Sequence, residues 1–275
     1  MSRELVPDAH CHLGDLPDPG LALEEAHGAG VGPVLAVAMG PDDGERVLDW
    51  KRRRPGLVLA GLGLHPSRVP ALTDGQVEEE IEAIERRIGE ADVVGEIGLD
   101  FKDAREPEQR RRQRRVLERL LRLAEAARRP VNLHTRRADR ELLERASDFT
   151  RRTGLSALLH WFTHSRELAA LGAGEGLYLS AGPSVLFDER QLEVARTIEA
   201  DLLLVETDAP VLYGGLAASP GWAVRVAGAL ARARGEAPEA MAARLARNMA
   251  RYLRRDITSP AGTTPPSRPT SPPAR

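Results

Sequence analysis

Short apolar segments and longer charged segments alternate eight times along this chain of 275 residues. Each apolar segment has the length of a buried strand, and helical spacing is evident in the charged segments between them. The segments expected as strands are 4–10, 31–39, 56–65, 92–100, 130–135, 155–162, 176–182 and 201–210. Strands that alternate with helices form a parallel sheet. Eight such units predict an α/β chain folded as a single (β/α)8 TIM barrel.

The clearest helix is expected between Pro107 and Arg128. Its apolar side chains recur at helical spacing, and Pro107 suits a first helical turn. An open, doubly wound sheet would instead require a glycine-rich phosphate-binding turn after the first strand. The sequence there reads HCHLGD, which lacks that pattern and therefore favours the closed barrel.

The barrel accounts for residues 1–256, and residues 257–275 form a separate segment rich in Pro, Ser and Thr. That segment has almost nothing to bury, so we expect a disordered tail. The sequence shows no signal peptide and no apolar run long enough to span a bilayer. Cys11 is the only cysteine, which excludes internal disulfides. We therefore expect a cytoplasmic monomer with no membrane association and no evident protein partner.

The formal net charge of −2 argues against a chain that binds nucleic acid through overall basic charge. Basic residues nevertheless cluster in segments 51–55 and 108–115. Such clusters are typical of a solvated helix face rich in arginine. A groove that binds phosphates is the alternative, and the sequence leaves both open.

Histidines and carboxylates gather at the carboxyl ends of six expected strands, where barrel enzymes carry their active sites. They are His10, His12, His65, Glu96, His134, His160 and Asp208. Alternate side chains of an extended strand share a face, so His10 and His12 are expected to point the same way. One histidine at a strand end is more often a hydrogen-bonded structural residue than a ligand. Six strand ends together predict a metal site.

Imidazole nitrogen and carboxylate oxygen together suit zinc, manganese or iron. This set offers more ligands than one tetrahedral zinc ion can bind. They fit two divalent ions that share a carboxylate and a water, with Zn, Mn and Mg as the candidates and Glu96 as the bridge. Cys11 is expected to face away from this site. Glu206 is expected one layer deeper, as a structural residue or a partner of a ligand.

Six short motifs that contain these polar residues follow one another along the chain. They are DAHCH, GLHP, VGEIGLDF, NLHTR, LLHWF and VETDAP. From Val6 to Leu253 their order resembles that of the TatD-type metal-dependent hydrolases of the amidohydrolase superfamily. The closing ARNMARYL, which contains Asn248, is similar to the last helix of that family. The resemblance implies metal-dependent hydrolysis of phosphodiesters, typically as a deoxyribonuclease.

The resemblance also implies which residues hold the ions. One ion would lie on His10, His12, Glu96 and Asp208. The other would lie on Glu96, His134 and His160. In a hydrolysis in which a metal-bound water attacks the phosphorus, Asp208 would accept a proton from that water, and the bridging Glu96 would also take part in catalysis. His65 and Arg136 would neutralise phosphate oxygens.

The chain departs from the family pattern at Trp161, at His164 and in the segment LYGGLAASPGWAV that follows Asp208. These departures concern substrate choice, because such loops form the wall of the pocket. Trp161 either stacks on a base or packs between barrel and helix. His164 is the better candidate for a substrate contact. If DNA is the substrate, we expect cleavage from an end, in the manner of a 3′–5′ exonuclease, with single strands preferred.

Two other functions stay open at this point. A dinuclear barrel can hydrolyse a lactone, an amide or another ester, such as the ester of an aminoacyl-tRNA, because a fold does not fix a substrate. The chain can also be a binding subunit without activity. The complete set of strand-end ligands argues against the latter, since a scaffold needs none of them.

Overall fold

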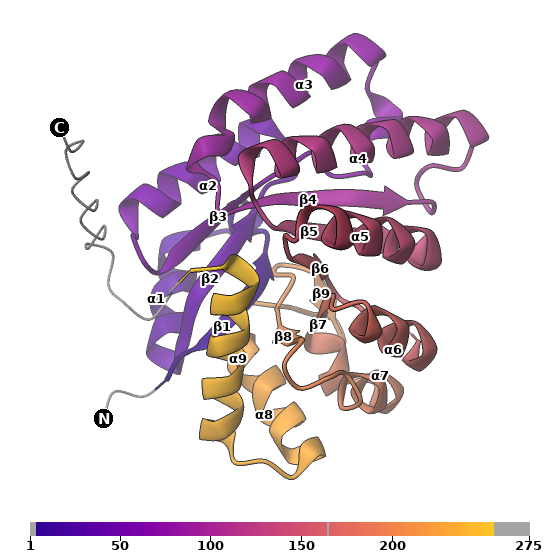
Figure 1. Cartoon of the computed structure of the whole chain (residues 1–275). Coiled ribbons are helices and arrows are strands. Elements are labelled where there is room, and N and C mark those ends of the chain that lie inside the picture. The colour runs from indigo at the N-terminus through magenta and orange to yellow at the C-terminus, as the bar shows by residue number, and fades with distance from the viewer. Residues whose placement is uncertain (1–3, 164, 256–275) are drawn as a thin grey trace, which may run out of the picture.

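Eight parallel strands form one sheet in the computed structural model, which describes residues 4–163 and 165–255 (Figure 1). The strands are β1 (Val6–Cys11), β2 (Val31–Val37), β3 (Val58–Leu62), β4 (Val93–Asp100), β5 (Val131–Arg136), β6 (Ala157–Leu159), β7 (Tyr178–Ala181) and β8 (Leu203–Val205). Each strand pairs with the next along the chain. The predicted TIM barrel is confirmed. His164 and the expected tail, 257–275, lie outside the described residues.

The barrel closes between β8 and β1 through backbone hydrogen bonds at their carboxyl ends. The amide of Asp208 donates to the carbonyl of His10 at 2.9 Å, and the amide of His12 donates to the carbonyl of Ala209 at 2.9 Å. Closure therefore brings the first and last groups of predicted ligands to the same point.

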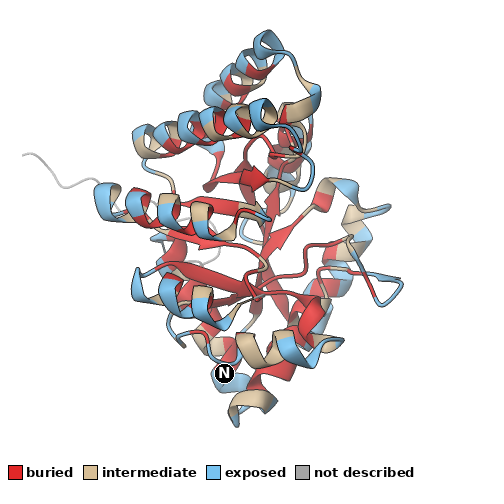
Figure 2. Ribbon diagram, turned by 90° about the vertical axis from the view of Figure 1, so that its right-hand side faces the viewer, coloured by how far each residue is buried: buried red, intermediate tan, exposed pale blue. Residues whose placement is uncertain are grey.

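Helices cover the outside of the sheet. They are α1 (Pro19–Ala29), α2 (Pro41–Arg53), α3 (Asp74–Arg87), α4 (Pro107–Ala127), α5 (Asp139–Thr153), α6 (Arg166–Gly174), α7 (Glu189–Ala195), α8 (Trp222–Arg234) and α9 (Pro238–Leu253). Figure 2 looks onto the carboxyl ends of the strands and shows buried strands inside a ring of helices with exposed outer faces. Four short 3-10 helices and a hairpin, β9 (Leu212–Tyr213) with β10 (Leu216–Ala217), complete the described fold. The helix predicted from Pro107 is α4.

The core has two apolar layers, one between the strands and the helices and one inside the barrel. The inner layer contains strand residues such as Leu35 and Leu204. Met249 and Tyr252 of α9 pack against these strand residues, and the Tyr252 hydroxyl donates to the carbonyl of Val131 at 3.0 Å. The last helix therefore belongs to the barrel core.

Three register shifts interrupt the pairing of β1 with β2 and of β4 with β5, and two of them include a predicted metal ligand. Residues 8–11 of β1 lie opposite residues 34–36 of β2, and residues 94–97 of β4 lie opposite residues 131–133 of β5. Such bulges change the direction of a side chain locally. These two segments contain the predicted ligands His10 and Glu96. Simple alternation along a strand does not predict these bulges.

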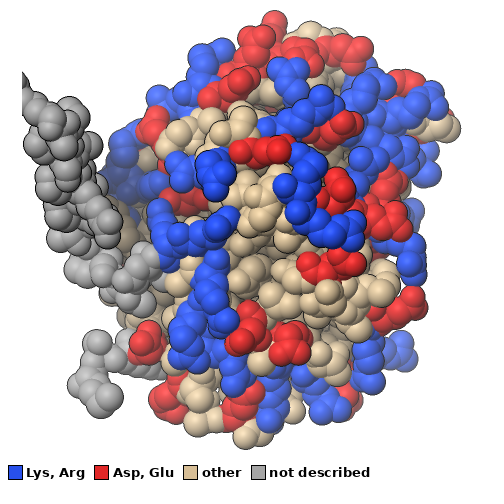
Figure 3. All heavy atoms as spheres, in the orientation of Figure 1, with Lys and Arg blue, Asp and Glu red and all other residues tan. Residues whose placement is uncertain are grey.

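The five arginines of segment 108–115 lie in the first half of α4, and all five have partners. They contact carboxylates of Glu108, Glu141 and Asp74, or backbone carbonyls. Figure 3 shows basic and acidic side chains interspersed over one face of the molecule. For this segment the contacts favour the ion-paired helix face over the phosphate groove. Among the described residues, no helix is long and apolar enough to cross a bilayer.

Candidate metal centre

Four donor atoms from β4, from β1 with the residue after it, and from the segment that follows β8 converge at the mouth of the barrel. They are Nε2 of His10, Nε2 of His12, Oε2 of Glu96 and Oδ1 of Asp208. The two nitrogens lie 3.4 Å apart, and each lies 3.4 Å from the Glu96 oxygen. Their distances to the Asp208 oxygen are 3.6 and 3.4 Å. Ligand atoms about 2.0–2.1 Å from a tetrahedral ion stand roughly 3.3–3.4 Å apart, so these spacings fit one divalent ion.

The other oxygen of Glu96, Oε1, faces a second group of nitrogens. His134 Nδ1 lies 2.7 Å from it, His160 Nε2 lies 2.9 Å away and His65 Nε2 lies 3.3 Å away. His134 Nδ1 is also 3.2 Å from His160 Nε2 and 3.3 Å from His65 Nε2. We call Glu96, His65, His134 and His160 the second donor group. Glu96 therefore lies between two sets of donors, as a bridging carboxylate would.

His65 lies closer to the metal-capable atoms than the sequence indicated. Glu96, His134 and His65 together form one of three groups of described residues that can hold a metal ion. The other two groups are His10, His12 and Glu96, and His10, His160 and Glu206. The contact of His65 with substrate, expected from the resemblance, stays a prediction.

The electrostatics of the cluster fit a cation. Burial alone would raise the pKa of Glu96, but His65, His10 and His160 hold it well below its usual value. Burial alone would lower the pKa of His12, but Asp208 and the charge of Glu96 raise it to about 9. Oε2 of Glu96 is buried and accepts no hydrogen bond from the residues that the structure describes. A metal ion would supply the positive charge that protons on the histidines otherwise provide.

Outer contacts determine which nitrogen of each ring faces the centre. Asn132 donates through Nδ2 to the carbonyl of Ala9, so its Oδ1, 2.9 Å from His10 Nδ1, accepts the proton of that ring. Nε2 of His10 is then free to bind a metal. Similarly, Nδ1 of His160 faces Glu206 at 3.5 Å, and Ser180 donates to Glu206. The structure thus places Glu206 beside a predicted ligand, which favours the second of the two expected roles, a partner of a ligand.

Asp100 is a site residue that the sequence analysis missed. Its Oδ2 lies 3.4 Å from Nε2 of His134, on the side of the ring away from Glu96. The signal was present in EIGLD, because Glu96, Gly98 and Asp100 are alternate residues at the end of one strand and share a face.

The predicted substrate contacts are less well defined. Arg136 ends β5 and is exposed, two residues after His134. Trp161 donates from its indole to Ser184 Oγ at 3.1 Å, and its ring lies 5.3 Å from that of Tyr213. These contacts favour the packing alternative for Trp161 over base stacking.

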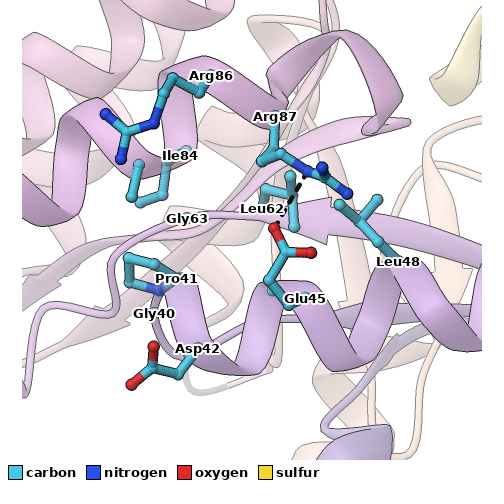
Figure 4. A pocket seen from close by; sticks show the side chains of 12 residues that line it. Gly40, Pro41, Asp42, Glu45, Leu48, Leu62, Gly63, Ile84, Arg86 and Arg87 are labelled. Atoms are coloured by element: carbon cyan, nitrogen blue, oxygen red, sulfur yellow. Dashed lines mark ion pairs between the residues drawn. The ribbon is translucent and has the colours of Figure 1, made fainter.

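A cavity of about 220 Å³ lies away from this centre, between α2, α3 and the end of β3 (Figure 4). Leu48, Leu62 and Ile84 line it, and an ion pair of 3.1 Å joins Glu45 to Arg87 beside it. None of the three metal-capable groups of the described residues includes a residue of this cavity. The metal-capable groups of the described residues therefore lie apart from this cavity.

Comparison with known proteins identifies the family to which this chain belongs. The sequence profile described as TatD related DNase matches residues 7–254. The chain belongs to the TatD-related DNase family. It is accordingly an enzyme, a metal-dependent hydrolase that acts on ester bonds. The resemblance to this family is confirmed.

Relatives within this family carry related descriptions. Deoxyribonuclease TATDN3 of Homo sapiens is 31% identical over 219 residues, which cover 74% of this chain and 78% of the relative. The uncharacterized metal-dependent hydrolase YjjV of Escherichia coli is 32% identical over 252 residues, covering 88% of this chain and 95% of the relative. The crystal structure of the same TatD homologue has a TM-score of 0.78 at 29% identity and covers 90% of this chain and 97% of that one.

Proposed function

We propose that this TatD-related hydrolase is a deoxyribonuclease that uses two divalent ions to cleave phosphodiester bonds. The observation that carries the proposal is the position of Glu96, whose two oxygens face two separate groups of imidazole nitrogens. We assign one ion to His10, His12, Glu96 and Asp208. We assign the other to Glu96, His134 and His160, with His65 close to the same atoms.

Divalent ions, when bound, acidify a water molecule and stabilise negative charge on a phosphoryl group. The residues of this chain provide the rest of the mechanism. Asp208 lies at the open end of the barrel and accepts the proton of the attacking water. Glu96 contacts the nitrogens of both sets of ligands through its two oxygens and so fixes their relative position. Arg136 neutralises phosphate oxygens that face the mouth, and His65 contacts the same oxygens.

We further propose that the enzyme removes nucleotides from the 3′ end of single strands. An unpaired strand bends into a barrel mouth more easily than a duplex does. His164, next to the buried Thr163 after β6, is the proposed substrate contact. A His164→Gly variant should change substrate preference more than metal content. We also propose that the enzyme acts as a monomer in the cytoplasm, in keeping with the free thiol of Cys11.

Metal analysis combined with a substrate panel tests this function. The purified protein should contain two equivalents of divalent metal, and a chelator should abolish hydrolysis until Mn, Mg or Zn is returned. Labelled single-stranded DNA should be degraded from its 3′ end faster than duplex DNA. Full activity after metal removal contradicts the two-ion proposal. Preferential hydrolysis of an aminoacyl-RNA or a lactone contradicts the assignment of DNA as substrate.

A further inference from the structure

Gln113 is the only polar side chain among the buried residues of α4. It is 1% exposed and lies in the stripe that otherwise consists of Val, Leu and Ala. Burying an amide costs free energy unless its donors and acceptor find partners. The partners of Gln113 therefore indicate why an amide occupies this position.

All three partners are backbone groups near the metal-capable centre. Oε1 of Gln113 accepts the amide hydrogen of Asp100 at 3.0 Å. Nε2 donates to the carbonyl of Asp100 at 3.1 Å and to the carbonyl of Pro66 at 2.8 Å. One side chain thus joins the end of β4 to the loop that follows β3.

Both of these backbone segments carry side chains that reach the second donor group. Asp100 Oδ1 accepts the amides of Lys102 and Asp103 at 2.9 and 3.0 Å, so the carboxylate is fixed from its own loop. Its Oδ2 is left to face Nε2 of His134 at 3.4 Å. In the other segment, Pro66 directly follows His65, whose Nε2 lies 3.3 Å from His134 Nδ1.

We propose that Gln113 is a positioning residue for a metal ion at the second donor group, acting through the backbone of Asp100 and Pro66. When Asp100 accepts the proton on Nε2 of His134, the lone pair of that ring stays on Nδ1, which faces Glu96. When Pro66 is held in place, His65 stays beside the same atoms. The inference rests on the proposed metal sites. It means that α4 helps to position the ligands of one of them through Gln113.

Loss of such an outer partner typically lowers metal affinity by about 10–100-fold. Gln113→Leu keeps the approximate volume of the side chain and removes all three hydrogen bonds. A competition titration of the full chain with Zn²⁺ and a chromophoric chelator should resolve two affinities. We expect one of them to fall about 10–100-fold in Gln113→Leu, with the other within a few-fold of the parent.

Asn248→Leu is the matched control. Asn248 is also buried, and its Nδ2 donates to the carbonyls of Ala200 and Leu203 at 2.8 and 2.7 Å. These bonds lie at the amino end of β8, opposite the metal centre. Both variants should lower the melting temperature of the metal-free protein, but Asn248→Leu should leave both zinc affinities unchanged.

A second variant tests the same chain of contacts without touching α4. Asp100→Asn keeps an oxygen for the two loop amides but presents an NH2 group to Nε2 of His134, which favours the wrong tautomer. We expect it to weaken the same single affinity. If Gln113→Leu does not fold, Asp100→Asn decides, and parental zinc affinities in that variant overturn the inference.

The inference is also overturned if Gln113→Leu is destabilised like Asn248→Leu but binds zinc as the parent does. An equal loss of zinc affinity in these two variants overturns it too, because general destabilisation then explains the loss. A parent protein that binds no divalent ion overturns the proposed function itself, which is a separate and recognisable result.

Discussion

At the scale of single residues, the centre depends on carboxylates that are buried among imidazole rings. Asp208 is 5% exposed and has a backbone φ of 50°, in the left-handed region that aspartate tolerates better than most residues. Its amide bonds to the carbonyl of His10, so the same residue closes the barrel and presents Oδ1 to two histidines. A change of its charge should therefore affect chemistry more than folding.

Asp208→Asn keeps the shape of the side chain and removes its charge and its basicity. We expect hydrolysis of DNA to fall by about 10³-fold or more, the scale seen when a key charged group is lost. Turnover and the melting temperature of the metal-free protein are the measurements. Asp148→Asn, a change on the outer surface of α5, serves as the control and should keep parental turnover. Parental turnover in Asp208→Asn contradicts the assigned role.

The raised pKa of His12 predicts a pH dependence for the metal-free protein. Its pKa is about 9 in the folded chain against an ordinary value of 6.5. The stabilisation is fully present below pH 6.5 and is lost as the pH rises through 9, because the folded state holds the proton more tightly. The free energy of unfolding should fall by about 3 kcal/mol over this range, and the melting temperature should fall with it.

Thermal unfolding in the presence of chelator, measured every half pH unit, checks this prediction. His12→Gln should make the curve between pH 6.5 and 9 less steep but not flat, because the pKa values of His134 and His160 are raised as well. Excess zinc should flatten it as well, because a ligand occupied by metal no longer carries the proton. An unchanged slope in His12→Gln shows that other groups cause the dependence.

At the scale of elements, β4 has to approach β5 closely for Glu96 to reach His134. Gly98 lies between Glu96 and Asp100 and has a φ of 157°. A Cβ at this position would lie 2.0 Å from the carbonyl oxygen of His134. Only glycine lets the two strands run this close beside the metal centre.

Gly98→Ala should therefore destabilise the protein by at least about 2 kcal/mol and weaken metal binding, since β5 must shift. Gly28→Ala, in α1, is the control because a Cβ there meets nothing within 4 Å. It should leave stability within about 1 kcal/mol of the parent, on the stabilising side. Urea unfolding of both variants is the measurement. Equal stability of the two would contradict the close-approach argument.

At the scale of the whole molecule, the described barrel is completed by α9. Met249 and Tyr252 from this helix lie in the inner apolar layer. The residues that follow Arg255 include few large apolar side chains. The described residues already supply both apolar layers of the core.

Deletion of residues 258–275 should leave the melting temperature and the turnover of the enzyme nearly unchanged, because this segment has little to bury. Extending the deletion to Met249 removes inner-layer side chains and should prevent folding. Calorimetry and a turnover assay on both truncated chains test the contrast. A clear fall in either quantity for the shorter deletion would show that the tail contacts the barrel.

The sequence by itself determined the barrel and the region of the centre. Eight alternations of strand and helix predict a closed parallel sheet, and the carboxyl ends of such strands meet at one mouth. Polar residues at six strand ends therefore had to gather there. The family resemblance followed from the order of the same residues along the chain.

Only the tertiary structure decided how the donor atoms meet. Bulges in β1 and β4 set the directions of His10 and Glu96, and a bulge depends on the pairing with a neighbouring strand. The place of His65 beside His134 joins residues 69 positions apart. In the sequence, Gln113 lies within a run of arginines. Its role could not be predicted from that run, because its three backbone partners come from two other segments of the chain. Contacts between separate elements have no local pattern in a sequence, and they set the geometry of this centre.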